Sequence, residues 1–66
     1  MPTGIIEQFS RGRGFGILQE EKTGQRYYVI FDAIEGGRDF LEPGQKVEFE
    51  PGKRGEADVA LKVRPR

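Results

Sequence analysis

The chain has 66 residues, of which 35% are hydrophobic and 33% charged, and its 11 basic side chains balance 11 acidic ones. This length allows one small domain with one compact core, so residues 1–66 are expected to form a single domain. Cysteine and histidine are absent, which excludes disulfides, thiolate metal sites and the usual general base near neutral pH. Because the net charge is zero, affinity for a polyanion must come from locally placed charges.

Glycine and proline divide the chain into short extended segments, and no helical period of useful length is present. In chain order, strands are predicted at residues 5–9, 15–19, 26–31, 46–50 and 57–63. Turns or loops are predicted at residues 10–12, 22–24 and 51–55. The longer connection between the third and fourth strands is expected to begin with a helical turn over residues 32–37, which Asp32 caps and glycines end.

Five short strands predict a closed sheet. As a flat sheet they would leave one face uncovered and two edges open to pairing with other chains. Closure into a barrel solves both problems, and the longer connection after the third strand favours an all-β, five-stranded antiparallel OB-fold barrel. An SH3-like barrel of similar length is the structural alternative.

The second and third predicted strands carry the most informative pattern. Residues 13–18 read Arg-Gly-Phe-Gly-Ile-Leu, and residues 27–31 read Tyr-Tyr-Val-Ile-Phe. Alternation places Phe15 and Ile17 on one face of the second strand. In the third strand it separates Tyr28 and Ile30 from Tyr27, Val29 and Phe31.

A chain of this length can hardly cover both faces of such a sheet. One face is therefore expected to carry exposed rings beside arginines, an arrangement that suits stacking on unpaired nucleobases. Ordinary packing is the alternative interpretation, since aromatic and β-branched residues are good strand formers wherever they lie.

Glycines and arginines surround Phe15. A phosphate-binding glycine loop must open a helix, whereas here a strand follows, so that interpretation is rejected. Gly14 and Gly16 instead allow a partner strand or a base to approach the backbone, or mark a bend where the barrel closes. Arg11 and Arg13 are expected to contact phosphates or stack on bases, with solvated loop arginines as the alternative.

No group is placed for catalysis. The carboxylates lack the sequence context of a paired acid and base, and the hydroxyls have no histidine to activate them. An enzyme is therefore not expected, and no cofactor or metal is implied. No segment resembles a signal peptide or reaches membrane-spanning length, which predicts a cytoplasmic protein without a membrane partner.

From residue 4 to about residue 63 the chain resembles the cold shock domain family, small five-stranded barrels that bind single-stranded RNA and DNA. The family's first ribonucleoprotein motif, Lys-Gly-Phe-Gly-Phe-Ile, corresponds to residues 13–18. The second, Val-Phe-Val-His-Phe followed by Ser-Ala-Ile, corresponds to residues 27–34. With the exposed face, the resemblance predicts a nucleic-acid site made of Phe9, Arg11, Arg13, Phe15, Ile17, Tyr28, Ile30, Phe31, Arg38, Phe40 and Arg54.

The departures from the family fall mainly on this face. Glu7-Gln8 replaces a basic residue and a tryptophan, Ile17 replaces a ring, and Ile30 replaces a histidine. Each base–aromatic stack is worth roughly 1–3 kcal/mol. The three lost positions are expected to weaken binding by on the order of 3–6 kcal/mol, and by less where the isoleucines keep apolar contact with a base. The expected affinity is then sub-micromolar to tens of micromolar. The loop before the fourth strand is one residue shorter, so either Phe40 or Arg38 takes the place of the family's loop aromatic.

The sequence is compatible with two functions. The first is non-catalytic binding of single-stranded RNA or DNA, which the resemblance connects with melting RNA structure or regulating transcription or translation. The second is a protein-interaction or self-association module, such as a homodimer, that uses the same apolar face. Glu7-Gln8, the two isoleucines and the zero net charge favour the second function.

Overall fold

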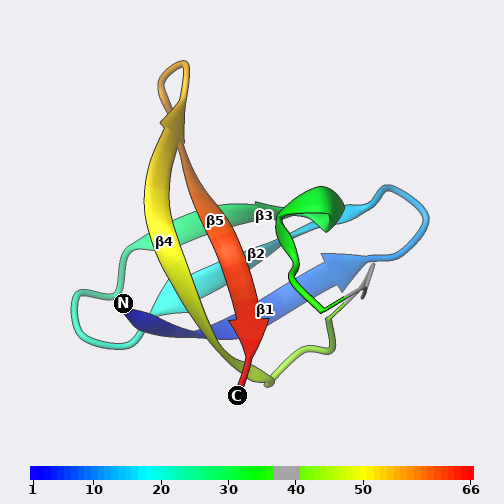
Figure 1. Cartoon of the computed structure of the whole chain (residues 1–66), viewed down its shortest axis with the longest axis horizontal. Helices are drawn as coiled ribbons and strands as arrows, with labels where there is room; N and C mark the ends of the chain where they lie inside the picture. Colours follow the sequence, from blue (N-terminus) through cyan, green and yellow to red (C-terminus); the bar gives the residue numbers. More distant parts are fainter. Residues whose placement is uncertain (37–40) are drawn as a thin grey trace.

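A closed barrel with the strand order β1-β2-β3-β5-β4 forms the molecule in this computed structural model, which describes residues 1–36 and 41–66 (Figure 1). Its elements are β1 (Thr3–Ser10), β2 (Phe15–Glu20), β3 (Arg26–Ile30), the 3-10 turn η1 (Phe31–Ala33), β4 (Lys46–Arg54) and β5 (Ala57–Pro65). The structure confirms the predicted all-β OB-fold barrel with a helical turn between β3 and β4. One strand pair in it, β3 with β5, is parallel.

The interior of the barrel is filled by side chains from alternate strand positions. The buried core consists of Ile6, Leu18, Tyr27, Val29, Val47, Phe49, Ala60 and Val63 from the strands, with Ile34 and Leu41 from the connection between β3 and β4. Val59 is also buried but lies outside this cluster. The ring centroids of Tyr27 and Phe49 lie 4.9 Å apart with the planes tilted by 55°, a favourable aromatic arrangement. Within the two described ranges, no helix has the length and apolar character needed to cross a membrane.

The β4–β5 hairpin is longer than predicted. The expected turn over residues 51–55 is wrong, because both strands continue to the pair formed by Arg54 and Ala57. Figure 1 shows this hairpin projecting beyond the rest of the barrel. Pro51 lies within β4, where the strand no longer pairs with β1, and proline is tolerated at such edge positions. The turn falls instead at Gly55, whose φ of 65° suits glycine.

The segment after β3 also differs from the prediction. β3 ends at Ile30, so Phe31 opens η1 and does not continue the strand. The Phe31 N–H still donates to the carbonyl of Gly14 at 2.8 Å, the residue that the β2–β3 register places opposite it, and the chain turns into η1 at this point. The predicted cap by Asp32 is wrong, since the N-cap residue is Ile30 and no side chain caps the turn. η1 is also shorter than the predicted turn over residues 32–37.

Candidate nucleic-acid interface

The outer face of β1, β2 and β3 presents its side chains in three rows, which follow from the strand register. The first row consists of Ser10, Phe15 and Ile30. The second row consists of Gln8, Ile17 and Tyr28. The third row consists of Ile5, Gln19 and Arg26, and the bulge residue Glu7 of β1 contacts Arg26 from beside this row. Adjacent rows are two residues apart along a strand, or about 7 Å.

Aromatic rings are exposed on the first two rows and just beside them. The exposed fractions are 38% for Phe15, 48% for Tyr28 and 50% for Phe31. The exposure of Phe15 and Tyr28 confirms the predicted ring-bearing face. Strand alternation placed Phe31 on the opposite face with Tyr27, and this is wrong because the strand ends one residue earlier. Phe31 therefore joins the outward rings.

These rings surround a shallow apolar hollow of about 350 Å³ between the sheet and the β4–β5 hairpin. Its lining residues are Arg13, Gly14, Phe15, Tyr28, Ile30, Phe31, Arg54, Ala57 and Val59. Gly14 brings the Phe31 ring close, since a Cβ at Gly14 would lie 3.0 Å from the Phe31 Cδ1 atom. The same glycine has a φ of 75°, a conformation that other residues adopt with strain. The sequence Arg13-Gly14-Phe15 thus positions both a charge and two rings.

The arginines of this hollow differ from most basic residues of the described chain. Ion pairs join acidic side chains to Arg26, Lys46, Lys53, Lys62, Arg64 and Arg66. Arg13 and Arg54 line the hollow and form no ion pair with any residue that the structure describes, a property shared by Lys22 in the β2–β3 turn. The rings therefore lie beside two guanidinium groups that are available to an anionic ligand.

Comparison with known proteins explains this combination of a small barrel, exposed rings and arginines. The family model described as the 'Cold-shock' DNA-binding domain matches residues 2–66. The chain belongs to the cold-shock domain family. This assignment confirms the resemblance seen in residues 13–18 and 27–34 and places the chain among nucleic-acid-binding domains.

Individual relatives share much of the sequence. A cold shock-like protein CspLB of Listeria monocytogenes is 45% identical over 58 residues, covering 83% of this chain and 86% of that protein. A probable cold shock protein A of Mycolicibacterium smegmatis is 37% identical over 65 residues, covering 97% of each chain. A cold shock protein CspD of Bacillus subtilis is 43% identical over 58 residues, covering 83% and 86%.

In this cold-shock domain Phe9 lies on the inner side of the sheet, half-buried against the core. The reason is a register shift between Ile6 and Gln8, which makes Glu7 an extra residue and reverses the alternation after it. Phe9 then pairs with Gly16, and a Cβ at Gly16 would lie 2.3 Å from the Gln8 carbonyl oxygen. The predicted close approach of a partner strand at Gly16 is confirmed. Phe9 still lines a second hollow, together with Arg13, Phe15 and Ile17.

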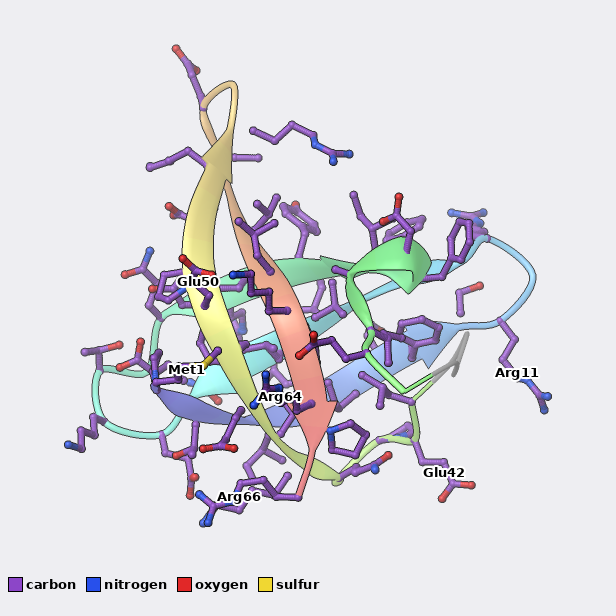
Figure 2. The ribbon with its side chains drawn as sticks, in the orientation of Figure 1. Met1, Arg11, Glu42, Glu50, Arg64 and Arg66 are labelled. Carbon is purple, nitrogen blue, oxygen red and sulfur yellow. The ribbon has the colours of Figure 1, made fainter. Side chains whose placement is uncertain are left out.

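The remaining predicted site residues differ in their relation to the hollow, which Ile30 lines and Ile17 does not. Ile17 and Ile30 are half-buried on the outer face between the exposed rings. Arg11 lies on the β1–β2 loop, and Figure 2 shows its side chain extending outward from the ribbon. Arg38 and Phe40 lie outside the described residues.

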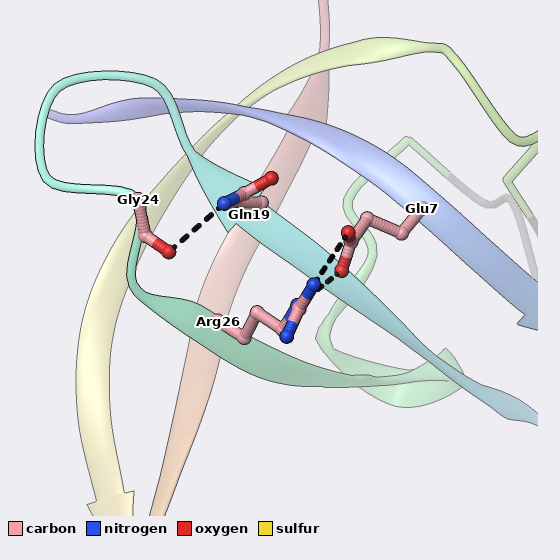
Figure 3. A network of polar contacts seen from close by, with 4 residues as sticks. All are labelled: Glu7, Gln19, Gly24 and Arg26. Atoms are coloured by element: carbon pink, nitrogen blue, oxygen red, sulfur yellow. Dashed lines mark hydrogen bonds and ion pairs between the residues drawn. The ribbon is translucent and has the colours of Figure 1, made fainter.

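The third row carries a contact that sequence reasoning missed. Glu7 of β1 and Arg26 of β3 meet across β2, at 2.7 Å from Arg26 Nε to Glu7 Oε1 and 3.3 Å from Nη2 to Oε2 (Figure 3). The Glu7 carboxylate hydrogen-bonded to Arg26 raises the pKa of that guanidinium. Gln19, on the strand between them, donates to the Gly24 carbonyl at 3.1 Å. Strand register alone aligns Arg26 with Gln19, but the bulge that brings Glu7 into reach has no clear sequence signal.

Proposed function

We propose that this cold-shock domain binds single-stranded nucleic acid without catalysing a reaction. The main supporting observation is that three exposed rings line one apolar hollow together with two arginines that form no ion pair within the described residues. Bases would stack on Phe15, Tyr28 and Phe31, each contact worth roughly 1–3 kcal/mol. Arg13 and Arg54 would contact the phosphates, which position a strand without reading its sequence.

The exposed rings favour binding of single strands over binding of a duplex. Stacking needs the flat face of a base, and in a duplex that face is covered by the neighbouring base pairs. Every base offers such a face, so sequence preference should be modest. Capture of unpaired segments would melt weak RNA structure or alter transcription or translation.

The side chains between the rings on the first two rows support a moderate affinity. Ile17 and Ile30 give apolar contact to a base but no ring, and Gln8 adds a polar group beside Ile17. Loss of about three stacking positions from a nanomolar binder leaves sub-micromolar to tens-of-micromolar dissociation constants.

Intrinsic tyrosine fluorescence offers a direct test, because the chain has two tyrosines and no tryptophan. Tyr28 lies on the exposed face while Tyr27 is buried, so a bound base alters chiefly the Tyr28 signal. Titration with thymine- or uracil-rich heptamers in low salt should give a saturable change, with a duplex of the same length about tenfold weaker or more. Absence of a saturable change up to about millimolar oligonucleotide rejects the proposal.

A second candidate function is association of two copies through the same face. It is favoured by the apolar lining of the hollow and by the isoleucines between the rings. Light scattering separates the two functions. A concentration-dependent dimer that blocks oligonucleotide binding supports association, and a monomer at about millimolar concentration rejects it.

A further inference from the structure

The two ends of the exposed face differ in how their arginines are engaged. Beside the first row, Arg13 and Arg54 have no ion-pair partner among the described residues. At the third row, both oxygens of the Glu7 carboxylate contact the Arg26 guanidinium, at 2.7 and 3.3 Å. A guanidinium binds a phosphate through the same paired geometry. The carboxylate therefore occupies the position that a backbone phosphate would take.

Arg26 is close enough to the rings to belong to the same surface. It lines a hollow together with Ile17 and Tyr28, and lies one row from Tyr28 on the same strand. The other charged side chains of this hollow are Glu56 and Asp58. Asp58 is held by Lys53 at 2.9 Å and by the Gln25 amide at 2.8 Å. This end of the face therefore presents carboxylates and no available cation from the hollow's described lining.

We propose that Arg26 is a phosphate-binding residue that Glu7 blocks, so that the nucleic-acid track ends at Tyr28. The inference rests on the proposed function and deepens it by setting the length of strand that is bound. The three exposed rings of residues 1–36 and 41–66 accommodate about three bases, one for each ring. A longer strand gains little, because its next phosphate meets a carboxylate.

The pair is exposed enough to be opened without disturbing the barrel. The side chains of Arg26 and Glu7 are 66% and 33% exposed, and exposed ion pairs contribute little to stability. Glu7→Gln keeps the size of the side chain and removes its charge, which leaves Arg26 available. A control is Glu48→Gln, which removes the same charge from a side chain that is 36% exposed and paired with Arg66.

The experiment compares oligothymidines of three and seven nucleotides on four proteins: wild type, Glu7→Gln, Glu48→Gln and the double variant Glu7→Gln/Arg26→Gln. We expect Glu7→Gln to bind the heptamer about tenfold more tightly and the trimer within about twofold of wild type. The slope of log affinity against log salt should steepen by about 0.7 for the one added phosphate contact. The gain should vanish in the double variant and be absent in Glu48→Gln.

The outcomes separate this inference from the proposed function. A gain that is equal for both lengths, or that Glu48→Gln reproduces, is a general charge effect and overturns the inference. An unchanged heptamer affinity in Glu7→Gln, with a wild-type protein that binds, also overturns it while leaving the proposed function intact. A wild-type protein that binds neither oligonucleotide rejects both.

Discussion

Gly16 shows how one position constrains both the barrel and its outer face. A Cβ there would lie 2.3 Å from the Gln8 carbonyl oxygen and 2.8 Å from the Phe9 Cα, both backbone atoms that cannot move without separating β1 from β2. By contrast, a Cβ at Gly12 in the preceding loop meets no atom within 4 Å. The two glycines therefore differ in how they tolerate a side chain.

We expect Gly16→Ala to lower the free energy of unfolding by about 1–3 kcal/mol or more, since overpacking strains the strand pair. Gly12→Ala, the matched control, should change it by less than about 0.5 kcal/mol. Urea denaturation of both variants measures the difference. Equal stabilities would show that the β1–β2 pair relaxes freely around the new methyl group.

Phe15 and Leu61 are a matched pair for testing the interface, because the two side chains are almost equally exposed. Their exposed fractions are 38% and 39%, but Phe15 lines the ring-bearing hollow and Leu61 lies on β5 outside it. Phe15→Ala should weaken oligonucleotide binding about tenfold or more, because one stacking contact is lost. Leu61→Ala should leave the affinity within about twofold. A Phe15→Ala protein that unfolds without a separate binding defect would place this ring in the core.

At the scale of elements, β4 builds the interior while the end of β3 completes the exposed face. Val47 and Phe49 of β4 are fully buried, and the Phe49 ring packs on Tyr27 of β3. β3 ends at Ile30, which releases Phe31 outward to the hollow. Phenylalanine thus has different roles at these two positions: Phe49 packs in the core, and Phe31 is an exposed ring on the surface.

Truncation of the two phenylalanines should separate these roles. Phe49→Ala should destabilise the barrel by about 3–5 kcal/mol, comparable with the whole stability of a domain of this size. Phe31→Ala should change stability by about 1 kcal/mol or less and weaken oligonucleotide binding about fivefold or more. Thermal unfolding and the fluorescence titration together distinguish them. Similar unfolding temperatures for the two variants would contradict the assignment of Phe31 to the surface.

At the scale of the whole molecule, charge placement matters more than net charge. The 11 basic and 11 acidic residues cancel, so the protein as a whole does not attract a polyanion over long distances. In the described ranges, ion pairs neutralise six basic side chains, whereas Arg13 and Arg54 have none and lie together at the hollow. Electrostatic attraction is therefore local and short-ranged.

The salt dependence of binding should reflect this local charge. Each phosphate contact on a single strand contributes about −0.7 to the slope of log affinity against log salt concentration. Contacts from Arg13 and Arg54 alone therefore give a slope of about −1.4. Contributions from Arg11 and Arg38 would extend it to about −2.8. Titrations between low and physiological salt measure the slope. A flat response would show that phosphates are not contacted.

Much of the fold could be predicted because the relevant signals are local. Period-two alternation and the spacing of glycines and prolines specify short strands, and five such strands in so short a chain can bury one face well only by closing. The same alternation correctly placed Phe15 and Tyr28 outward and Val47 and Phe49 inward. The motif in residues 13–18 indicated the family for the same reason, since its residues are contiguous.

Contacts between segments that are distant in the sequence decided the features that could not be predicted. Phe31 turns outward because β3 gives way to η1 at this residue, and the bulge at Glu7 turns Phe9 inward. That bulge and the register of three strands also bring Glu7 to Arg26, which lies 19 residues later in the chain. Alternation describes a strand by itself, whereas strand ends, bulges and cross-strand partners depend on which backbone groups meet once the barrel closes. The sequence alone therefore determined the barrel and its ring-bearing face, and the tertiary structure decided which charges on that face stay available to a ligand.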